Sequence, residues 1–359
     1  MSKKRMSMIP LREVIYVNQI VCDTEYIMVG DIGGTNSNFG FFLLADDTFT
    51  LIFSLHVKSQ LITDFSVLIK DIVSYVKGKY QISVVKSGFA AAGIVSETLD
   101  YSKPTNLNIV IDSKDILAKT GLKCSFVVND FAVIGYGLEL IKPHDLVLVN
   151  KGIARPRANK GILGAGTGLG KCIMDWNKYA GRYIPVASEG GHADFAVQNQ
   201  LELDLVEHIQ KTESFSCSVS WEGLLSGNGI ERIYRFFCSR NHGIPKSVSF
   251  SEKGPHPDEI FNSRMQDDHA WRTFELYTKI YARCAKNFAL ESLALGGIYI
   301  AGGIAAKNLP LFELDVFMDE FVNCGKHEEV LADIPIYVIT DYNISLYGAA
   351  HYMKLESMC

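Results

Sequence analysis

Short apolar runs alternate with stretches of helical periodicity through the first half of the chain. Residues 26–29 and 39–44 form apolar runs of strand length on either side of a glycine-rich segment. After Asp64, apolar residues recur at intervals of three and four through residues 65–76, which predicts a helix with one buried face. Residues 124–128 predict another strand, and a helix is expected to follow it. Strands that alternate with helices in this way are typical of α/β layer structures.

The second half of the chain shows the same alternation. A long helix is predicted over residues 267–295, where aromatic and apolar residues fall one to four positions apart. Residues 241–258 are rich in Gly, Pro, Ser and His, which predicts a loop. The other predicted elements are strands at residues 145–149, 161–164, 171–176, 298–301 and 336–339, and helices at residues 200–211, 229–238 and from 345 onward.

The length of the chain indicates that these elements form more than one hydrophobic core. The chain has 359 residues, of which 48% are hydrophobic, and a chain of this length is expected to form two lobes. A net charge of −5, without a basic stripe, argues against a nucleic-acid partner. No apolar run reaches the roughly 18 residues of a membrane-spanning helix, so no membrane partner is expected.

The eight cysteines carry no recognisable metal or redox motif. None of them forms a C-x-x-C pair, and most have apolar neighbours. We therefore interpret them as reduced thiols, as found in a reducing compartment. The first residues also lack the basic-then-apolar order of a secretory signal, so a cytoplasmic location is expected.

A glycine-rich turn with one carboxylate joins the first two predicted strands. Backbone N–H groups in such a turn form a concave anion site, and an aspartate beside them is a ligand type that Mg²⁺ prefers. An ordinary hairpin with glycines at positive φ gives a similar pattern, so the turn alone leaves both interpretations open. The turn consists of Gly30, Asp31, Ile32, Gly33, Gly34 and Thr35.

A second glycine cluster spans residues 164–170. A dinucleotide-binding fingerprint would need glycine where Leu169 stands, and a Walker A loop would need glycine at Ala165 and Ser or Thr at Cys172. Both motifs are therefore excluded. A glycine inside a strand costs roughly 0.5–1 kcal/mol, so this many glycines favour close approach of the backbone to a ligand. The cluster predicts a second strand–turn–strand phosphate site.

Asn129 and Asp130 follow an apolar strand and precede a predicted helix. Ligands of open α/β sheets bind at the carboxyl ends of strands, so Asp130 is a candidate general base. An aspartate in this position is also a common helix N-cap, and this structural role stays open.

Glu189 and His192 stand close together in the sequence, and Glu222 follows downstream. Metal coordination is one interpretation, but Gly190 and Gly191 interrupt any helix that would place Glu189 and His192 on one face. Carboxylates and a neutral imidazole also bind neighbouring sugar hydroxyls, and we favour this role over a metal site.

Six segments, taken together and in this order, resemble the superfamily of sugar kinases, actin and heat-shock ATPases, and most closely the bacterial-type glucokinase family. One such segment is weakly specific, whereas six in the same order are highly specific. Ser188 and Asn228 depart from the residues common in bacterial members, and both only neighbour the expected contacts. The segments are VGDIGGTN (29–36), VNDFA (128–132), GAGTGLG (164–170), SEGGHADFA (188–196), EGLLSGNG (222–229) and GGIYIAGGI (296–304), and they span nearly the whole chain.

The resemblance implies an α/β fold of two actin-like (ribonuclease H-like) domains around a central cleft. Residues 1–25 would form an N-terminal extension, and residues 26–138 a small domain that also includes a C-terminal helix at 341–359. Residues 139–340 would form the large domain. Members of the family often form homodimers, so a homodimer is expected here.

The resemblance also assigns roles to individual residues. Asp130 is the expected catalytic base, facing the 6-hydroxyl of glucose, and Asp31 is expected beside Mg²⁺. The expected sugar ligands are Asn106, Asn129, Asp130, Glu189, His192 and Glu222. The expected ATP ligands are Gly30, Asp31, Ile32, Gly33, Gly34, Thr35, Gly166, Thr167, Gly168, Gly302 and Gly303.

These roles imply an ATP-dependent glucokinase, which transfers the γ-phosphoryl group of ATP to the 6-hydroxyl of glucose in the first step of glycolysis. A kinase for another hexose or an N-acetylhexosamine is one alternative, because the sequence does not settle which 2-substituent is accommodated. A non-catalytic sugar sensor is the other. Asp130 and both glycine turns are intact, and residues 1–25 are too few for a helix-turn-helix unit, which disfavours the sensor.

Overall fold

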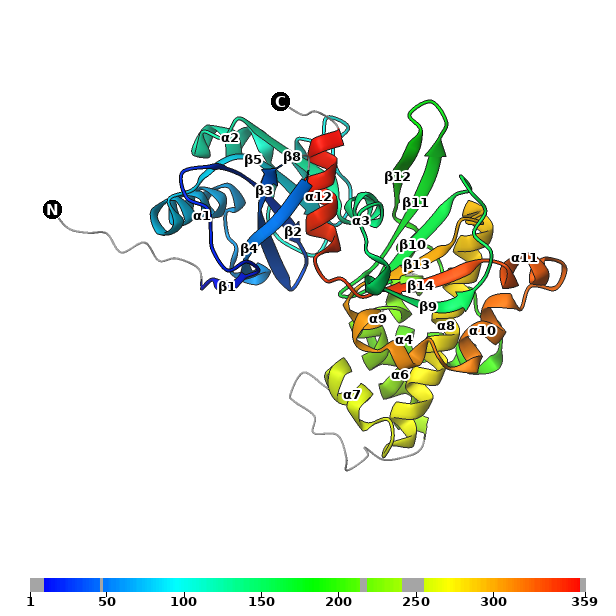
Figure 1. The fold of residues 1–359 in the computed structure, drawn as a ribbon. Coiled ribbons are helices and arrows are strands. Elements are labelled where there is room, and N and C mark those ends of the chain that lie inside the picture. Colours follow the sequence, from blue (N-terminus) through cyan, green and yellow to red (C-terminus); the bar gives the residue numbers. More distant parts are fainter. Residues whose placement is uncertain (1–9, 46–47, 214–217, 241–254, 356–359) are drawn as a thin grey trace. The chain divides into compact units, whose positions relative to one another are not determined.

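The computed structural model describes residues 10–45, 48–213, 218–240 and 255–355, which form two compact units. Unit 1 contains the described residues of Met1–Ile141 and Asn343–Cys359, and unit 2 those of Lys142–Tyr342. Each unit combines a six-stranded sheet with helices, so the predicted α/β class is confirmed (Figure 1). Among the described residues, no helix is long and apolar enough to cross a membrane.

The sheet of unit 1 has the strand order β1–β4–β3–β2–β5–β8. Strands β2, β3 and β4 form an antiparallel meander, and β5 and β8 run parallel to β2. Strands β6 and β7 pair separately. The bounds are β1 Arg12–Ile15, β2 Glu25–Ile32, β3 Asn36–Ala45, β4 Thr48–Lys58, β5 Ser83–Ala91, β6 Tyr101–Ser102, β7 Ile111–Asp112 and β8 Cys124–Asn129.

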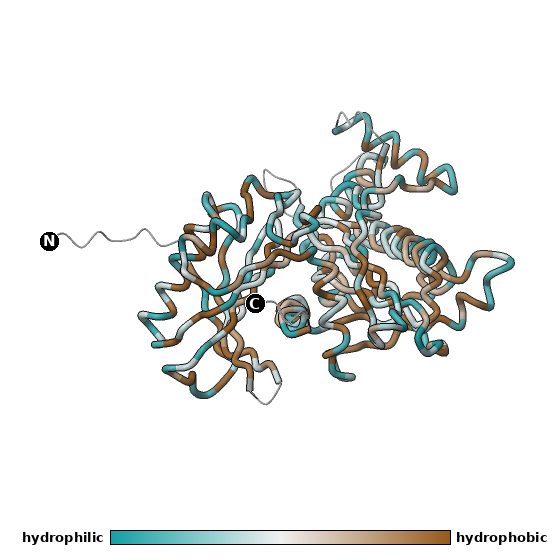
Figure 2. Tube along the Cα trace, turned by 90° about the horizontal axis from the view of Figure 1, so that it is seen from above, coloured by the Kyte–Doolittle hydropathy of each residue, from teal (hydrophilic) through white to brown (hydrophobic). Residues whose placement is uncertain are grey.

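Helices cover both faces of this sheet, because both faces are apolar. Tyr26 and Met28 of β2 belong to the core under α1 and α2, whereas Val29 belongs to the core under α3 and α12. Alternate side chains of a strand point to opposite faces, so a strand buried on both sides is apolar throughout. Figure 2 shows hydrophobic and hydrophilic stretches alternating along the chain trace. The bounds are α1 Phe65–Tyr80, α2 Ser113–Thr120, α3 Asp130–Leu138 and α12 Ile344–Leu355, with the 3₁₀ turn η1 at Ser59–Leu61.

Two glycines allow the C-terminal helix α12 to pack closely against α3. A side chain at Gly348 would collide with the carbonyl oxygen of Val133, and one at Gly137 with the carbonyl oxygen of Ile344. The two backbones therefore touch at positions where only glycine fits. This packing holds the C-terminal helix beside the helix that begins at Asp130.

Five strands of the unit 2 sheet repeat the arrangement of unit 1, and the sixth strand lies at the opposite edge. The strand order of the unit 2 sheet is β12–β11–β10–β13–β14–β9. Strands β10, β11 and β12 form an antiparallel meander, and β13 and β14 extend the sheet parallel to β10. Strand β9 pairs antiparallel with β14. The bounds are β9 Leu146–Lys151, β10 Lys160–Ala165, β11 Leu169–Asn177, β12 Arg182–Ser188, β13 Ile298–Ala301 and β14 Pro335–Ile339.

One large hydrophobic core of unit 2 is built around α8 (Asp268–Ser292). Asp267 caps the start of α8 by accepting from the amides of His269 and Ala270, and Leu293 ends it in the left-handed conformation. The other helices are α4 Gln200–Glu213, α5 Trp221–Leu224, α6 Gly227–Arg240, α7 Pro257–Ser263, α9 Gly303–Lys307, α10 Asp315–Val322 and α11 Glu328–Ala332, with 3₁₀ turns η2 Pro143–Asp145, η3 Gly190–His192, η4 Leu309–Leu311 and η5 Gly325–His327.

Some local features differ from the sequence predictions. β1 is an edge strand that the irregular apolar pattern of residues 1–25 did not predict. Helix α7 begins inside the predicted loop 241–258, because Pro257 suits the first helical turn and His256 and Glu259 form a capping box. Residues 241–254 of that loop lie outside the described residues.

The prediction of reduced cysteines holds only in part. Cys124, at the start of β8, is disulfide-bonded, so the prediction is wrong at this position. The free thiols among the described cysteines are Cys22, Cys172, Cys238, Cys284 and Cys324.

Candidate active site

The turn between β2 and β3 is held by a serine from η1. Ser59 donates from its hydroxyl to the carbonyl of Gly33 (2.5 Å) and from its amide to the carbonyl of Thr35 (3.1 Å). The amide of Gly33 donates to the carbonyl of Asn36 (3.1 Å), which closes the turn. A Cβ on Gly33 would lie only 3.0 Å from that oxygen, so the first phosphate turn predicted from sequence has a tightly defined backbone.

Asp31 is half-buried near the end of β2. Ser345, at the start of α12, donates a hydrogen bond of 2.7 Å to its Oδ2. Burial raises the pKa of the Asp31 carboxyl, and the hydrogen bond from Ser345 lowers it in part. A cation beside this carboxylate would offset the cost of burying its charge, so the residues present fit the Mg²⁺ site predicted here.

Asp31 and Asp130 lie at the same edge of the sheet of unit 1. The register pairs Ile32 of β2 with Ala91 of β5, and Ala91 with Asn129 of β8. The carboxyl ends of three parallel strands therefore meet, as expected for a ligand site in an α/β sheet. The fold thus brings the first glycine turn and the candidate base together, although they are distant in sequence.

Asn129, rather than Asp130, is the N-cap of α3. Its Oδ1 accepts from the amides of Phe131 (3.0 Å) and Ala132 (3.1 Å), and its Nδ2 donates to the carbonyl of Gly93 (3.2 Å). Asp130 is the first helical residue, and its Oδ1 accepts from the amide of Phe131 (3.0 Å). The N-cap interpretation of Asp130 is therefore wrong, because the preceding amide side chain performs the capping.

Asn106 lies in the loop between β6 and β7, next to the chain segment that Asn129 contacts. A Cβ on Gly93 would lie 2.5 Å from the hydroxyl of Thr105, and the amide of Thr105 donates to the carbonyl of Ala92 (3.4 Å). Asn106 follows immediately and is exposed. The predicted sugar ligands Asn106 and Asn129 therefore flank the same short segment at the end of β5.

Glu222 braces the turn between β10 and β11. Its Oε2 accepts from the amide of Leu169 (2.9 Å), and a side chain at Gly168 would collide with this carboxylate oxygen. The amide of Gly166 donates to the carbonyl of Gly168 (2.8 Å), and the amide of Gly227 donates to the carbonyl of Gly166 (3.0 Å). The second glycine turn is therefore tied to the starts of α5 and α6.

His192 lies between Glu189 and Glu222. Its Nε2 is 3.7 Å from Glu189 Oε2, and its Nδ1 is 3.8 Å from Glu222 Oε1. Gly190 and Gly191 lie in the short 3₁₀ turn η3, in which residues three apart eclipse, so Glu189 and His192 come close without the α-helix that the two glycines were expected to interrupt. Within the described residues, no group of three or more His, Cys, Asp or Glu side chains could hold a metal ion.

Gly302 and Gly303 follow β13 and lie beside the second glycine turn. Gly302 has φ +92°, and a Cβ there would lie 2.5 Å from the carbonyl oxygen of Ala165. The register of β10 and β13 pairs Gly164 with Ala301. The residues predicted to bind adenosine and those predicted to bind phosphate therefore meet at one edge of the sheet of unit 2.

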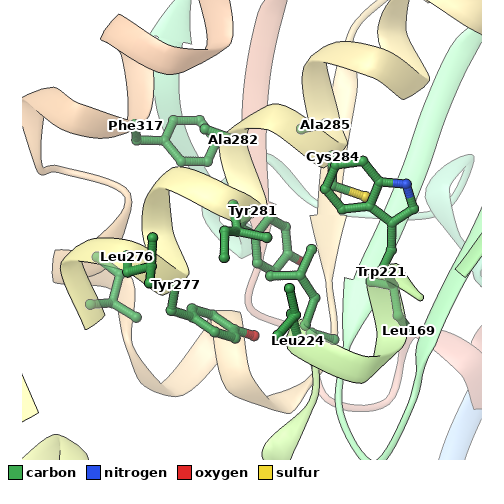
Figure 3. Close-up of a cluster of buried hydrophobic side chains, with 14 of the residues drawn as sticks. Leu169, Trp221, Leu224, Leu276, Tyr277, Tyr281, Ala282, Cys284, Ala285 and Phe317 are labelled. Carbon is green, nitrogen blue, oxygen red and sulfur yellow. The ribbon is translucent and has the colours of Figure 1, made fainter. Parts of the chain in front are cut away.

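A buried hydrophobic cluster anchors Trp221, the residue that precedes Glu222. Trp221 of α5 lies with Tyr281 and Cys284 of α8 and with Leu169 of β11 (Figure 3). Burial raises the pKa of the Cys284 thiol to about 11, so it stays protonated and packs as a small apolar group. The anchored indole sets where α5 begins and hence where the next residue, Glu222, lies.

Sequence reasoning missed the residues that orient these groups. Ser220 caps α5 by accepting from the amide of Gly223 (3.2 Å), and its position before Trp221 was a usable N-cap signal. Ser345 opens a predicted helix, but its contact with Asp31 joins residues from opposite ends of the chain. Ser59 carries no comparable local signal.

The family model described as Glucokinase matches residues 28–356. The chain belongs to the glucokinase family. Among the relatives, a glucokinase of Nostoc punctiforme is 32% identical over 340 residues, covering 90% of this chain and 97% of that protein. A glucokinase of Synechocystis is 32% identical over 349 residues, covering 90% of this chain and 96% of that protein. The resemblance deduced from the six sequence segments is therefore confirmed.

Solved structures of glucokinases share the fold of this family member. The glucokinase of Balamuthia mandrillaris in complex with glucose has a TM-score of 0.78 at 20% identity, covering 91% of this chain and 93% of that one. A ROK family glucokinase of Streptomyces griseus in complex with glucose and AMPPNP has a TM-score of 0.63 at 18% identity, covering 92% and 99%. These likenesses confirm the predicted actin-like α/β fold.

Proposed function

We propose that this protein is an ATP-dependent glucokinase that converts glucose and ATP to glucose 6-phosphate and ADP. Its membership of the glucokinase family supports the proposal. The observation that carries it is the shared sheet edge at which β2 and its glycine turn meet Asn129 and Asp130. One rigid sheet thereby offers both a carboxylate base and a backbone site for phosphate, and phosphoryl transfer depends chiefly on such positioning.

Asp130 is the proposed base. It accepts the proton of the 6-hydroxyl while the sugar oxygen bonds to the γ-phosphorus and the bond from that phosphorus to the β,γ-bridging oxygen breaks. Asn129 caps α3 and so holds Asp130 at the first helical position, besides contacting the sugar. Asn106 completes the sugar contacts in unit 1.

In unit 2, the trio of Glu189, His192 and Glu222 binds the sugar hydroxyls nearer the anomeric carbon. Support comes from the spacing of the trio, which leaves the imidazole within 4 Å of a carboxylate on each side, at 3.7 and 3.8 Å. Adjacent carboxylate and imidazole groups can accept and donate to vicinal hydroxyls at once.

The two glycine turns are the proposed phosphate sites, and Gly302 and Gly303 belong to the adenosine site. Asp31 would hold Mg²⁺, which supplies charge neutralisation to the phosphates. Glucose phosphorylation of this kind is the first step of glycolysis, and we propose that this protein performs it in the cytoplasm as a homodimer. Light scattering of the purified protein tests the dimer independently of activity.

The activity is tested with purified protein, Mg·ATP and a panel of glucose, mannose, N-acetylglucosamine and N-acetylmannosamine. We expect ADP release with glucose, much less with the other sugars, and weak ATP hydrolysis without sugar, because the catalytic groups should assemble only around bound sugar and should not activate water in its absence. Turnover confined to an N-acetylhexosamine would replace glucose as the substrate. ATP binding without turnover of any sugar would instead favour the sensor.

A further inference from the structure

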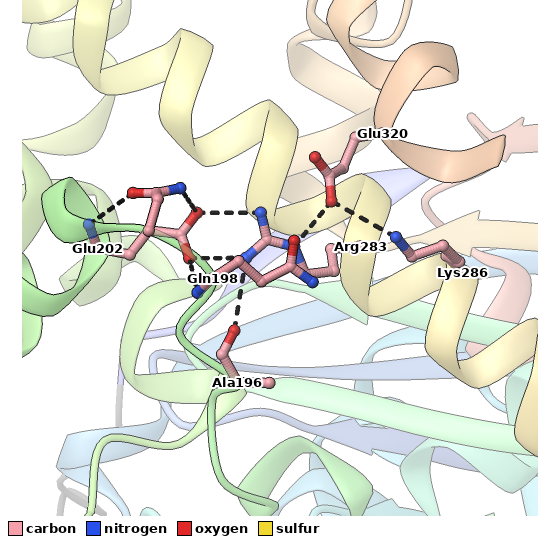
Figure 4. A network of polar contacts seen from close by, with 7 residues as sticks. Ala196, Gln198, Glu202, Arg283, Lys286 and Glu320 are labelled. Carbon is pink, nitrogen blue, oxygen red and sulfur yellow. Dashed lines mark hydrogen bonds and ion pairs between the residues drawn. The ribbon is translucent and has the colours of Figure 1, made fainter. Parts of the chain in front are cut away.

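A buried ion network lies within the helical part of unit 2. The guanidinium of Arg283 pairs with Glu202 through both Nη atoms (2.8 and 3.0 Å) and with Glu320 through Nε (2.8 Å). Lys286 adds a second contact to Glu320 (3.5 Å), as Figure 4 shows. The side chains of Arg283 and Glu202 are 1% and 0% exposed. The proposed catalytic chemistry uses none of these charges.

Stability alone explains such a network poorly. The desolvation cost of a buried ion pair largely offsets its attraction, and apolar side chains of similar volume stabilise a core at least as well. A bidentate guanidinium–carboxylate pair does impose a strict geometry on the segments that carry it. The segments joined by Arg283 therefore indicate what the network positions.

Glu202 binds the backbone segment that follows His192. Its Oε2 accepts from the amide of Gln198 (2.9 Å), and its Oε1 accepts from the side-chain amide of Asn199 (2.9 Å). The side chain of Asn199, just before α4, in turn accepts from the amide of Glu202 (3.0 Å) in the first turn of that helix. Arg283 also donates to the carbonyl of Ala196 (3.5 Å). The network thus holds residues 196–199 at several points.

This held segment continues directly into the proposed sugar site. The amide of Phe195 donates to the carbonyl of Val219 (2.9 Å), and the amide of Trp221 donates to the carbonyl of Ala193 (2.9 Å). The rings of Phe195 and Trp221 meet edge to face at 5.2 Å, and the guanidinium of Arg283 lies 6.0 Å from the Phe195 ring centroid. The two backbone hydrogen bonds form a bridge between residues 193–195 and 219–221. A continuous chain of contacts therefore runs from Arg283 to this bridge, which His192 directly precedes and Glu222 directly follows in the sequence.

We propose that the Arg283–Glu202 pair is a positioning element for glucose recognition, holding His192 and Glu222 at the spacing that the sugar hydroxyls require. The proposal rests on the proposed function of that trio. The pair acts through the bridge between residues 193–195 and 219–221 and touches no substrate itself. Loss of the pair should weaken glucose binding more than ATP binding.

The network provides its own matched control. Glu320 binds the same guanidinium and is also buried, but its other contact is to Lys286, which donates to the carbonyl of Asn323 at the end of α10. Glu320 makes no hydrogen bond to residues 193–199 among those found in the described residues. Glu202→Gln and Glu320→Gln thus each remove one buried carboxylate from Arg283, on opposite sides.

The test measures KM for glucose, KM for ATP and kcat of both variants at a temperature well below their melting transitions. The melting temperature of each variant is measured separately. We expect Glu202→Gln to raise KM for glucose about tenfold and KM for ATP by a clearly smaller factor, because His192 and Glu222 would bind the sugar directly, whereas the displacement reaches the phosphate turn only through the contact of Glu222 with Leu169. Both variants should lower the melting temperature by similar amounts, but Glu320→Gln should leave KM for glucose unchanged. Equal effects of the two variants on KM would overturn the proposal and assign the network to stability.

Phe195→Leu provides a second route if Glu202→Gln does not fold. It removes the ring between Arg283 and Trp221 without touching any charge, so KM for glucose should rise in the same selective way. Hydrogen exchange of the amides at 193–198 and 219–222 should increase in both variants and stay low in Glu320→Gln. Unchanged exchange in these segments would contradict the positioning role. If the wild-type protein phosphorylates no hexose, the proposed function fails instead, whereas the exchange pattern can still be measured.

Discussion

The two units share the arrangement of five strands, and each has a glycine turn between the first two strands of its meander. The two turns are braced by different chemistry. In unit 1 a neutral hydroxyl from Ser59 holds the turn, and the nearby carboxylate of Asp31 contacts Ser345. In unit 2 the carboxylate of Glu222 holds the turn and also approaches His192. The hydroxyl of Ser59 braces the unit 1 turn without involving the proposed sugar ligands Glu189, His192 and Glu222, whereas the carboxylate of Glu222 connects the unit 2 turn to them.

This difference teaches that a repeated topology does not repeat its function. The unit 1 turn meets a candidate base and a candidate metal ligand at its sheet edge, while residues 164–170 of unit 2 contain no carboxylate. Under the proposed function, unit 1 would therefore supply the chemistry at the transferred phosphoryl group. In unit 2, the proposed sugar ligand Glu222 also contacts the second glycine turn.

The largest effect is expected for Asp130→Asn, which removes the proposed base from unit 1. We expect kcat to fall by roughly 10²–10⁴ while glucose still binds, because asparagine keeps the shape but accepts no proton. Steady-state kinetics and calorimetric glucose binding measure the two quantities. Asp112→Asn, at the N-cap of α2, is the matched control and should keep full activity, since asparagine caps a helix equally well. Near-normal turnover of Asp130→Asn would refute the base assignment.

An intermediate effect is expected when alanine replaces one glycine of each turn. Gly168→Ala pushes a methyl group against the Glu222 carboxylate, so it should raise KM for glucose as well as KM for ATP, each by about tenfold. Gly33→Ala meets only the carbonyl of Asn36 and should affect ATP alone. Steady-state kinetics with each substrate varied in turn separate the two cases.

The contrast between the turns has its own control. Gly166→Ala adds a methyl group with no atom within 4 Å, so it should leave both protein stability and KM for glucose unchanged. If Gly33→Ala and Gly168→Ala raised KM for glucose equally, the proposed independence of the unit 1 turn would be wrong.

The smallest effect concerns the pH dependence of unit 1. Burial, with a smaller contribution from Arg12, lowers the pKa of His56, which contacts Asn38 (2.6 Å) and Ser54 (2.8 Å) through its ring nitrogens. The unfolded chain therefore binds a proton more readily than the folded one. Stability is full above the unfolded pKa near 6.5 and decreases as the pH falls below it. Thermal unfolding between pH 7.5 and 5.5 should show a drop of a few degrees at most.

Substitution of His56 separates this contribution from general acid effects. His56→Gln should flatten the pH dependence, whereas His144→Gln, at an exposed position, should leave it as in the wild type. Identical pH profiles for the two variants would show that His56 does not contribute.

Local sequence signals predicted much of the fold. Asp64 and Asp267 mark helix starts because their side chains accept from the first amides, and both are observed caps. The apolar run at residues 26–29 predicted a strand, which is observed as part of β2. Edge strand β1 was missed because its short, irregular pattern has meaning only beside β4.

The candidate site was predicted as a set of residues rather than as an arrangement. The sequence excluded a helix across Gly190 and Gly191 but did not predict the 3₁₀ turn η3, which brings Glu189 and His192 to 3.7 Å. It offered Asp130 as a helix cap, although Asn129 caps α3. Both points escaped the sequence because turn geometry and the choice of capping side chain depend on neighbouring segments that local patterns do not report.

The sequence by itself determined the α/β class, the glycine turns and the kinds of chemistry available to this protein. These depend on periodicity, backbone freedom and functional groups, which are local properties. Only the tertiary structure decided that Ser345 contacts Asp31, that Glu222 braces Leu169, and that Arg283 holds the segment after His192. Such contacts join residues far apart in the chain, and their geometry is set by packing of whole elements rather than by any local preference.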